Sequence, residues 1–349
     1  MSLRVIVKSL IVAAAFAGLQ PGAPAVAAES PVGAFYEGKQ VSLLIGYPPG
    51  GGYDAYARLV ARHLGRHIPG HPTIVPSNMP GAGSIILANH LYNRAAKDGT
   101  VIGMVTGDAA LNPLFGLAEA HFDSLKLSWI GSVNKETSIC LAWHSAPIKS
   151  IDDVFHRDFI VGTSSSTGTT FSYPTSSNAL LGTKFKIVSG YEGTNGVWLA
   201  IERGEVEGVC GTPWNSIRSG RPQWIRDKLI TVILQEATTR NPDLPDVPTV
   251  MDIAKTDEQK RVLELIYGWQ IMGRPLVAPP GLPPDRFAAL RQAFDATMQD
   301  ADFRAEAVKM MLDVNPLTGA EIDAFLARVF QTPRQLIERA AAALGRTDR

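Results

Sequence analysis

The sequence predicts an α/β protein of two lobes, each holding a mostly parallel β-sheet flanked by helices. Apolar strand-like runs alternate with amphipathic helix-like runs, as in sheets whose strands are joined by helical crossovers. Loops rich in glycine, serine or threonine follow several of the strand-like runs. The chain of 349 residues, less an N-terminal export signal, is long enough for two domains of ordinary size.

The alternation of strand and helix patterns begins with an apolar run at residues 41–45 and an amphipathic run at 55–67. A further strand, helix and strand complete a βαβαβ unit that ends at residue 105. The second half repeats the scheme. Its predicted strands span residues 159–162, 186–188, 206–211 and 230–234, and its predicted helices span 171–181 and 197–202.

The chain is expected to cross between the lobes twice. An extended run at 129–142 leads into the second lobe, and a strand-like run at 269–278 leads back. The first lobe is therefore predicted as residues 35–132 plus 251–345, and the second as residues 133–250. Hinges are expected near 133–137 and 247–251. Later helices are predicted at 285–299, 302–311 and 320–343, the last opened by the capping-box spacing of Thr318 and Glu321.

Residues 1–28 are predicted to be a secretory signal peptide. Arg4 and Lys8 precede a short apolar run, and small residues at 25–28 suit a cleavage site. A retained membrane anchor is the alternative. The 33 basic and 33 acidic residues balance, so removal of Arg4 and Lys8 leaves a net charge of about −2. That balance does not indicate a nucleic-acid partner.

The cysteines and histidines give no metal-binding pattern. Cys140 and Cys210 lie in strand-like runs. Export to an oxidising compartment permits a disulfide between them, and two separate buried thiols are the alternative. His63, His67 and His71 recur every four residues but lack the glutamate of a zinc helix, so a solvated helix end is expected. We expect neither a metal nor a cofactor.

The loop Tyr-Pro-Pro-Gly-Gly-Gly-Tyr-Asp at residues 47–54 is the leading candidate for a ligand site. Its glycines let a ligand approach the main chain, and the helix behind it offers unpaired amides and a positive dipole end. These features suit a carboxylate or another small anion.

Loops at the carboxyl ends of strands in both lobes should line one cleft. Asp54 could instead cap the following helix, Ser164–Thr167 could be only a helix-start cluster, and Trp214 could seal the core of the second lobe. The candidate ligand-binding residues are Tyr47, Gly51, Gly52, Tyr53, Asp54, Gly83, Asp108, Ser164, Ser165, Ser166, Thr167, Tyr191, Thr194 and Trp214.

The glycine loop resembles the first ligand loop of the Bug/TctC family, the solute receptors of tripartite tricarboxylate transporters. Other segments resemble the family in the same order, over nearly all of residues 35–341. They are residues 78–83, 97–100, 112–113, 164–167, 191–193, 244–249 and 278–281.

The resemblance implies a type II-like periplasmic binding fold whose lobes close on a small organic carboxylate. The ligand would be held by backbone amides, hydroxyls and bridging water rather than by arginine. The resemblance also implies a periplasmic location and delivery to a membrane permease with a large and a small subunit. We expect the receptor to be monomeric.

Three departures from the family pattern bear on the ligand. Met79 stands where the family often has arginine, Tyr53 where it usually has threonine or serine, and Glu192 where many members have a basic residue. With Asp108, Glu192 disfavours a multiply charged ligand such as citrate and favours a monocarboxylate or one bearing an amine. An aromatic or elongated ligand could be walled by Tyr47, Tyr53, Tyr191 and Trp214.

An enzyme and a ligand sensor are the two alternative function classes. An enzyme is disfavoured because the chain lacks a P-loop, a complete dinucleotide fingerprint after Gly81 and a nucleophile elbow at residues 162–166. A ligand sensor that reports to a membrane signalling protein would have the same fold and pocket, so this alternative stays open.

Overall fold

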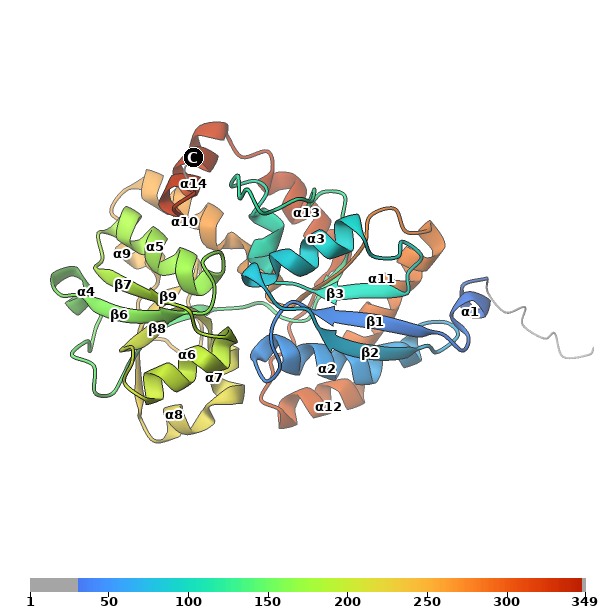
Figure 1. Cartoon of the computed structure of the whole chain (residues 1–349), viewed down its shortest axis with the longest axis horizontal. Helices are drawn as coiled ribbons and strands as arrows, with labels where there is room; N and C mark the ends of the chain where they lie inside the picture. The colour runs from blue at the N-terminus through green and yellow to red at the C-terminus, as the bar shows by residue number, and fades with distance from the viewer. Residues whose placement is uncertain (1–30, 347–349) are drawn as a thin grey trace, which may run out of the picture.

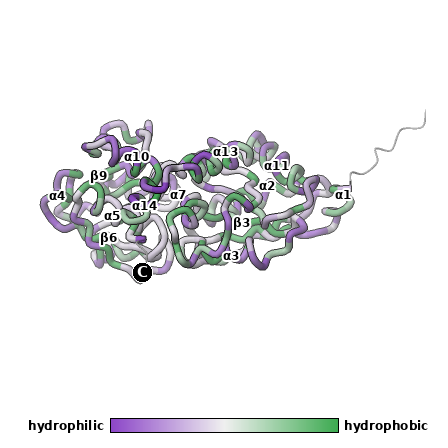
Figure 2. Tube along the Cα trace, turned by 90° about the horizontal axis from the view of Figure 1, so that it is seen from above, coloured by the Kyte–Doolittle hydropathy of each residue, from purple (hydrophilic) through white to green (hydrophobic). Residues whose placement is uncertain are grey.

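The computed structural model describes residues 31–346, which form two lobes side by side along the long axis of the molecule (Figure 1). Each lobe is built on one sheet flanked by helices, which confirms the predicted two-lobed α/β class. The predicted signal peptide lies outside the described residues. Figure 2 shows hydrophobic segments in both lobes, interspersed with hydrophilic ones along the chain.

The first sheet has six strands in the order β11-β4-β10-β3-β1-β2, and the second has five in the order β7-β6-β8-β5-β9. The first sheet comprises β1 (Gln40–Ile45), β2 (Thr73–Asn78), β3 (Val101–Met104), β4 (Ser128–Ser132), β10 (Pro275–Ala278) and β11 (Leu317–Thr318). The second comprises β5 (Ser138–Trp143), β6 (Phe159–Thr163), β7 (Phe185–Ser189), β8 (Gly208–Pro213) and β9 (Ile230–Glu236).

Both sheets are mixed, so the expectation of mostly parallel sheets needs correction. β1 is parallel to β2 and β3, and β6 is parallel to β7 and β8. However, β10 is antiparallel to β3 and β4, and β5 is antiparallel to β8 and β9. β5 and β10 enter their sheets directly from the other lobe, without the helical crossover that joins parallel neighbours.

Helices cover both faces of the first sheet. Side chains Val41, Leu43 and Ile45 of β1 alternate onto one face, where they are fully buried in a core shared with α2, α11 and α12. The helices and 3₁₀ turns of this lobe are α1 (Pro31–Tyr36), α2 (Gly52–Leu64), η1 (Gly65–His67), η2 (Ala82–Ser84), α3 (Ile85–Asn93), η3 (Gly107–Leu111), α11 (Pro284–Gln299), α12 (Ala301–Lys309) and α13 (Gly319–Val329).

The second sheet carries α5 on one side and α6 to α8 on the other, and the C-terminal helix α14 contacts α5 and α10 (Figure 1). The lobe boundaries at 132/133 and 250/251 stay a prediction. The remaining helices are α4 (Asp153–His156), α5 (Thr169–Leu181), α6 (Gly193–Glu202), α7 (Trp214–Gly220), α8 (Pro222–Arg226), α9 (Val250–Ile253), α10 (Asp257–Tyr267), η4 (Gly268–Met272) and α14 (Arg334–Ala343).

The predicted helix at 320–343 is two helices. Its capping box is confirmed by two hydrogen bonds. The Thr318 side chain accepts one from the Glu321 amide, and the Glu321 side chain accepts the other from the Thr318 amide. The helix ends at Val329, and α14 begins only after Pro333. Proline has no N–H to donate within a helix, so it stands at the start of the next one.

Two crossover segments, residues 133–137 and 268–274, run side by side between the lobes. The Val133 amide donates to Arg274 O at 3.1 Å, and the Gly273 amide donates to Asn134 O at 2.8 Å. The hinges expected near 133–137 and 247–251 stay a prediction. Thr249 forms a bridge to Gln235 of β9 and caps α9. The proline-rich stretch before it is thus held against the second sheet.

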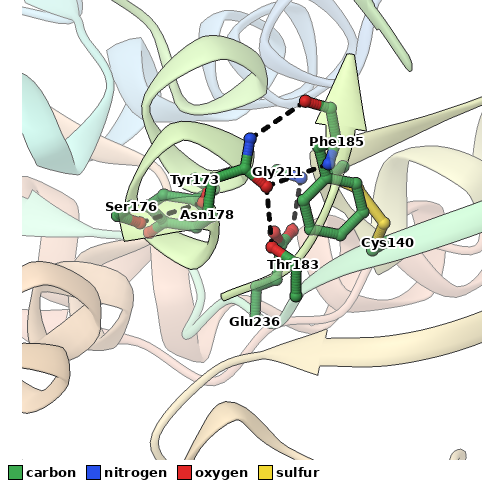
Figure 3. The surroundings of a disulfide bond; sticks show 9 residues. Cys140, Tyr173, Ser176, Asn178, Thr183, Phe185, Gly211 and Glu236 are labelled. Carbon is green, nitrogen blue, oxygen red and sulfur yellow. Dashed lines mark hydrogen bonds between the residues drawn. A yellow bond between two sulfur atoms is a disulfide. The ribbon is translucent and has the colours of Figure 1, made fainter. Parts of the chain in front are cut away.

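Cys140 and Cys210 form a disulfide between the neighbouring strands β5 and β8 (Figure 3). Both cysteines are fully buried. The β5–β8 register shifts between Ile139 and Leu141, which places the disulfide at an irregularity in the ladder. The structure thus decides for the disulfide over two separate thiols.

A buried acid, Glu236, lies beside the disulfide (Figure 3). One carboxyl oxygen accepts a hydrogen bond from the Gly211 amide, and the other has no hydrogen-bond partner. Burial raises the pKa of Glu236 from 4.5 to about 8, because a charge there would lose its hydration.

The raised pKa of Glu236 should make stability fall as pH rises. The unfolded chain loses this proton near pH 4.5 and the folded protein only near pH 8. The folded state therefore binds more protons in between, and the free energy of unfolding should decrease from about pH 5 to pH 8. Glu236→Gln keeps an acceptor for Gly211 and should flatten this profile in urea titrations. Parallel profiles for the two proteins would contradict the assignment.

Candidate ligand-binding site between the lobes

The glycine loop is braced by Asp54. Helix α2 begins after Gly51, which provides no side-chain cap, and Asp54 is the third residue of the helix. Its carboxylate accepts from the Gly50 amide at 3.0 Å, from Arg58 at 2.9 Å and from Asn78 at 2.9 Å. Burial raises the pKa of Asp54, but these hydrogen bonds outweigh it and leave the pKa low. The alternative of an N-cap role is wrong, because Asp54 lies inside the first turn.

Tyr47 and Tyr53 form a stacked aromatic wall beside the glycines, with ring centroids 4.7 Å apart and planes 10° apart. The Tyr53 hydroxyl donates to Gly273 O at 3.2 Å in the crossover segment. The Arg274 guanidinium lies 4.2 Å from the Tyr53 ring centroid, a cation–π distance. Gly273 and Arg274 of the crossover segment therefore hold the Tyr53 ring in place.

A cavity of about 30 Å³ lies between this loop and the second lobe. A water molecule needs about 10–15 Å³ on this measure, whereas pockets for small organic ligands hold about 300–1,000 Å³. The lobes are thus closed on a space for very few waters. The cavity is lined by Tyr47, Pro48, Pro49, Gly51, Gly52, Tyr53, Glu192, Gly193, Thr194 and Asn195.

Glycines stand where the closed lobes meet. A Cβ atom on Gly83 would lie 3.0 Å from the Cα atom of Gly168, and one on Gly193 would lie 2.9 Å from a ring carbon of Pro48. Gly83 also has a φ of +59°, in the left-handed region that glycine enters most easily. Glycine at these points lets the two backbones approach closely.

Gly83→Ala should hinder closure. The added methyl group meets backbone that cannot move aside like a side chain, so we expect about tenfold weaker ligand binding and less contraction on ligand addition in small-angle scattering. Gly38→Ala is the matched control, because Gly38 has a similar φ of +65° but no atom within 4 Å of the added group. Equal binding by both variants would argue against closure at Gly83.

Two of the four predicted aromatic wall residues lie elsewhere. The Tyr191 ring lies next to Gly162, 3.4 Å from where a Cβ atom on that glycine would stand. Burial and the nearby Glu205 raise the pKa of Tyr191. Trp214 lies in the apolar core of the second lobe, and its indole nitrogen donates to Asp243 at 3.3 Å. In this closed arrangement only Tyr47 and Tyr53 form the wall.

The serine-rich loop is bonded largely to itself. The Ser165 hydroxyl contacts the Thr167 hydroxyl at 3.1 Å and accepts from the Thr167 amide at 3.2 Å. The N-cap of α5 is Gly168 without a side-chain cap bond, so the helix-start alternative is not observed for these hydroxyls. Ser164 is half-buried, while Ser166 and Thr167 line a separate hollow of about 490 Å³ that also includes Arg346.

Asp108 lies in η3 at the end of β3 and is only 8 % exposed. Its Oδ1 atom has no hydrogen-bond partner. Burial raises the Asp108 pKa to about 6, and its charge acts on Tyr47 and Tyr53. The prediction placed Asp108 in the ligand site; the structure places it close to the aromatic wall but not in the lining of the small cavity.

Sequence reasoning missed the buried ion pair of Arg274 and Glu136. Both side chains are fully buried, and Nη1 of Arg274 lies 2.6 Å from Oε2 of Glu136. Burial lowers the pKa of Arg274, but the charge of Glu136, the nearby Tyr53 and Tyr56 and the hydrogen bond to Glu136 together outweigh it, so the pKa is raised and the guanidinium stays protonated. Nη2 of Arg274 also donates a hydrogen bond to the Ser216 hydroxyl of α7 at 3.2 Å. The only sequence signal was an arginine inside an apolar run.

Within residues 31–346, no group of three or more metal-binding side chains comes together. The three spaced histidines are not a free helix end, because His63 is buried and contacts Glu306 at 2.6 Å. Over the same described part of the chain, no helix is both long enough and apolar enough to cross a membrane.

Two lobes, two adjacent crossover segments and a cavity between glycine-rich loops define a two-lobed ligand-binding protein of the periplasmic binding type. The chain belongs to the family described as "Tripartite tricarboxylate transporter family receptor" (TctC), whose pattern it matches over residues 56–341. This confirms the family resemblance of the sequence motifs. The family is one of solute receptors and not of enzymes.

One curated relative and three solved structures illustrate the similarity. The "UPF0065 protein in gbd 5'region" of Cupriavidus necator is 24% identical over 352 residues, covering 95% of this chain and 96% of that protein. The periplasmic binding protein BugD has a TM-score of 0.69 at 19% identity, covering 88% of this chain and 98% of its own.

Two structures from Rhodopseudomonas palustris share the fold and were solved with ligands. MatC with bound malate has a TM-score of 0.65 at 19% identity, covering 87% of this chain and 99% of its own. A second protein, solved with adipate, has a TM-score of 0.69 at 17% identity, covering 88% and 98% respectively. At these identities the likeness speaks for the fold.

Proposed function

We propose that this protein is a periplasmic solute receptor that binds a small organic carboxylate between its lobes and delivers it to a tripartite tricarboxylate-type permease. The observation that carries the proposal is the cavity lined from both lobes at the start of α2. The amides of the first helical turn have no intrahelical acceptor, and the dipole adds positive potential. A carboxylate suits this position.

The comparisons support the proposal in two ways. The family is named for receptors of tricarboxylate transporters. Two structural neighbours were solved with malate and with adipate, both of which are carboxylates. The permease partner and the periplasmic location are supported by the family, and the monomeric state is a further part of the proposal.

Thermal melting of the mature protein against a carboxylate panel tests the receptor function. The panel should contain monocarboxylates, dicarboxylates, citrate, aromatic acids and amino acids. A ligand at 100 times its Kd should stabilise the protein by about 2.7 kcal/mol, which raises the melting temperature by several degrees. No shift with any carboxylate, in protein shown by mass spectrometry to carry no bound ligand, would contradict the proposal.

Gly51→Val should abolish binding without unfolding the protein. The φ of Gly51 is −91°, so a side chain is tolerated there without strain. Its Cβ would approach the Thr194 hydroxyl at 3.7 Å, and the valine methyl groups would fill the cavity. Gly51→Ala should have an intermediate effect. Unchanged affinity of Gly51→Val, by calorimetry with the ligand found in the panel, would count against binding at this loop.

A further inference from the structure

The first-lobe wall of the cavity is electrically positive. Gly51, Gly52 and Tyr53 line it at the start of the 13-residue helix α2. The glycines leave their amides open to a ligand. The nearest acid of this helix, Asp54, is engaged by Arg58 at 2.9 Å. A carboxylate at this wall therefore meets unpaired amides without a competing free acid.

The second-lobe wall combines the start of α6 with an acidic side chain, Glu192. Glu192 is the one charged side chain among the described residues that line the cavity. It stands at the N-cap of α6, but its side chain makes no capping bond. None of the hydrogen bonds or ion pairs formed in residues 31–346 uses its carboxylate. Glu192 is exposed, so its carboxylate can accept a hydrogen bond from a ligand.

The surrounding charges leave Glu192 uncompensated. Arg274 lies close to Gly52: a Cβ atom added to Gly52 would stand 3.3 Å from Nη2 of Arg274. The Arg274 guanidinium is, however, already paired with Glu136 at 2.6 Å. Asp108 adds a second acid near the aromatic wall, and the positive charge of Arg346, which acts on Asp108, is also acted on by Glu119. Among the described residues, no cation lines the cavity itself to balance a second carboxylate on the ligand. Lys309 lines a separate hollow of about 300 Å³ together with Gly50, Gly51 and Gly52.

Resting on the proposed receptor function, we propose that the ligand is a small zwitterion, with its carboxylate at the start of α2 and its ammonium group on Glu192. A second carboxylate at that position would be repelled by Glu192. An uncharged end would leave Glu192 without a partner, whereas an ammonium group forms a charge-assisted hydrogen bond. The narrow gap between the loops favours a short chain between the two charges.

Three matched sets of ligands test the proposal by calorimetry on the full mature protein. Each set contains an amino acid, the dicarboxylate in which a carboxylate replaces the ammonium, and the fatty acid in which a methyl group replaces it. The sets are glycine, malonate and propionate; β-alanine, succinate and butyrate; and γ-aminobutyrate, glutarate and valerate. We expect the amino acid of at least one set to bind about tenfold or more tighter than both partners, the effect of one charge-assisted hydrogen bond.

Glu192→Gln should remove this preference, and Asp246→Asn should preserve it. Asp246 is an exposed acid of the same lobe that does not line the cavity. Tighter binding of the dicarboxylates, or a preference that survives Glu192→Gln, would overturn the inference while leaving the receptor function intact. Binding of none of the nine compounds would also overturn it, and the wider carboxylate panel would then decide separately whether the protein is a carboxylate receptor.

Discussion

Arg274→Ala is expected to lower the free energy of unfolding by about 3–5 kcal/mol, as measured by urea titration. The substitution leaves the fully buried Glu136 carboxylate without its partner at 2.6 Å. It also removes the guanidinium from the Tyr53 ring, 4.2 Å away, and from the Ser216 hydroxyl. A buried charge without a partner keeps neither its hydration nor its ion pair, so the loss should be large.

Two controls separate the buried charge from the loss of any arginine. Arg334→Ala breaks an exposed pair with Glu338 and should change stability by less than about 1 kcal/mol. The double variant Arg274→Met with Glu136→Leu removes both charges together and should be far more stable than Arg274→Ala alone. A double variant no better than the single one would mean that the stranded carboxylate is not the cause.

The ion pair also joins the two crossover segments. Arg274 and Glu136 lie on the two crossover segments, and Arg274 reaches both Tyr53 of the first lobe and Ser216 of the second. Its loss should therefore weaken ligand affinity as well as stability. Arg218 of α7 makes a second link, with Asp313 at 3.1 Å, but it is partly exposed and should contribute less.

Replacing both Cys140 and Cys210 by alanine is expected to lower the free energy of unfolding by about 2–4 kcal/mol. The disulfide joins residues 70 positions apart, so it restricts a long loop of the unfolded chain. Because both sulfurs are fully buried between β5 and β8, the alanines also lose packing. The measurement is urea unfolding of wild type and variant, each with and without reductant.

Reductant provides the internal control for the disulfide. It should lower the stability of the wild-type protein toward that of the variant and leave the variant unchanged. Alkylation of the denatured, unreduced wild-type protein should label no cysteine, as read by mass spectrometry. Two labelled cysteines would show that the disulfide does not form in the exported protein.

Local patterns predicted most of the strands and the longer helices. The run at 41–45 became β1, and Thr318 with Glu321 opened α13, because side-chain alternation and capping depend on neighbouring residues. The same patterns assigned the wrong secondary structure to part of the return crossover. The apolar run at 269–278 was expected to be one strand, yet Gly268–Met272 is a 3₁₀ turn and β10 begins at Pro275.

The structure brings part of the predicted site residues together around the cavity, and the others lie apart for physical reasons. The glycine loop, Tyr47, Tyr53 and Thr194 line the cavity because loops at the carboxyl ends of strands meet between the lobes. Tyr191 and Trp214 turned toward the second lobe, where burial of their rings outweighs exposure in the cleft. The hydroxyls of Ser165 and Thr167 contact each other within their own loop.

The sequence by itself determined the fold class, the family and the position of the glycine loop, because these follow from periodicity and short motifs within a few residues. The tertiary structure alone decided which strands are antiparallel, that Cys140 and Cys210 join, and that Arg274 meets Glu136 behind Tyr53. Each of these contacts joins residues far apart in the chain. Their proximity depends on how the two lobes pack and close, which no local pattern encodes.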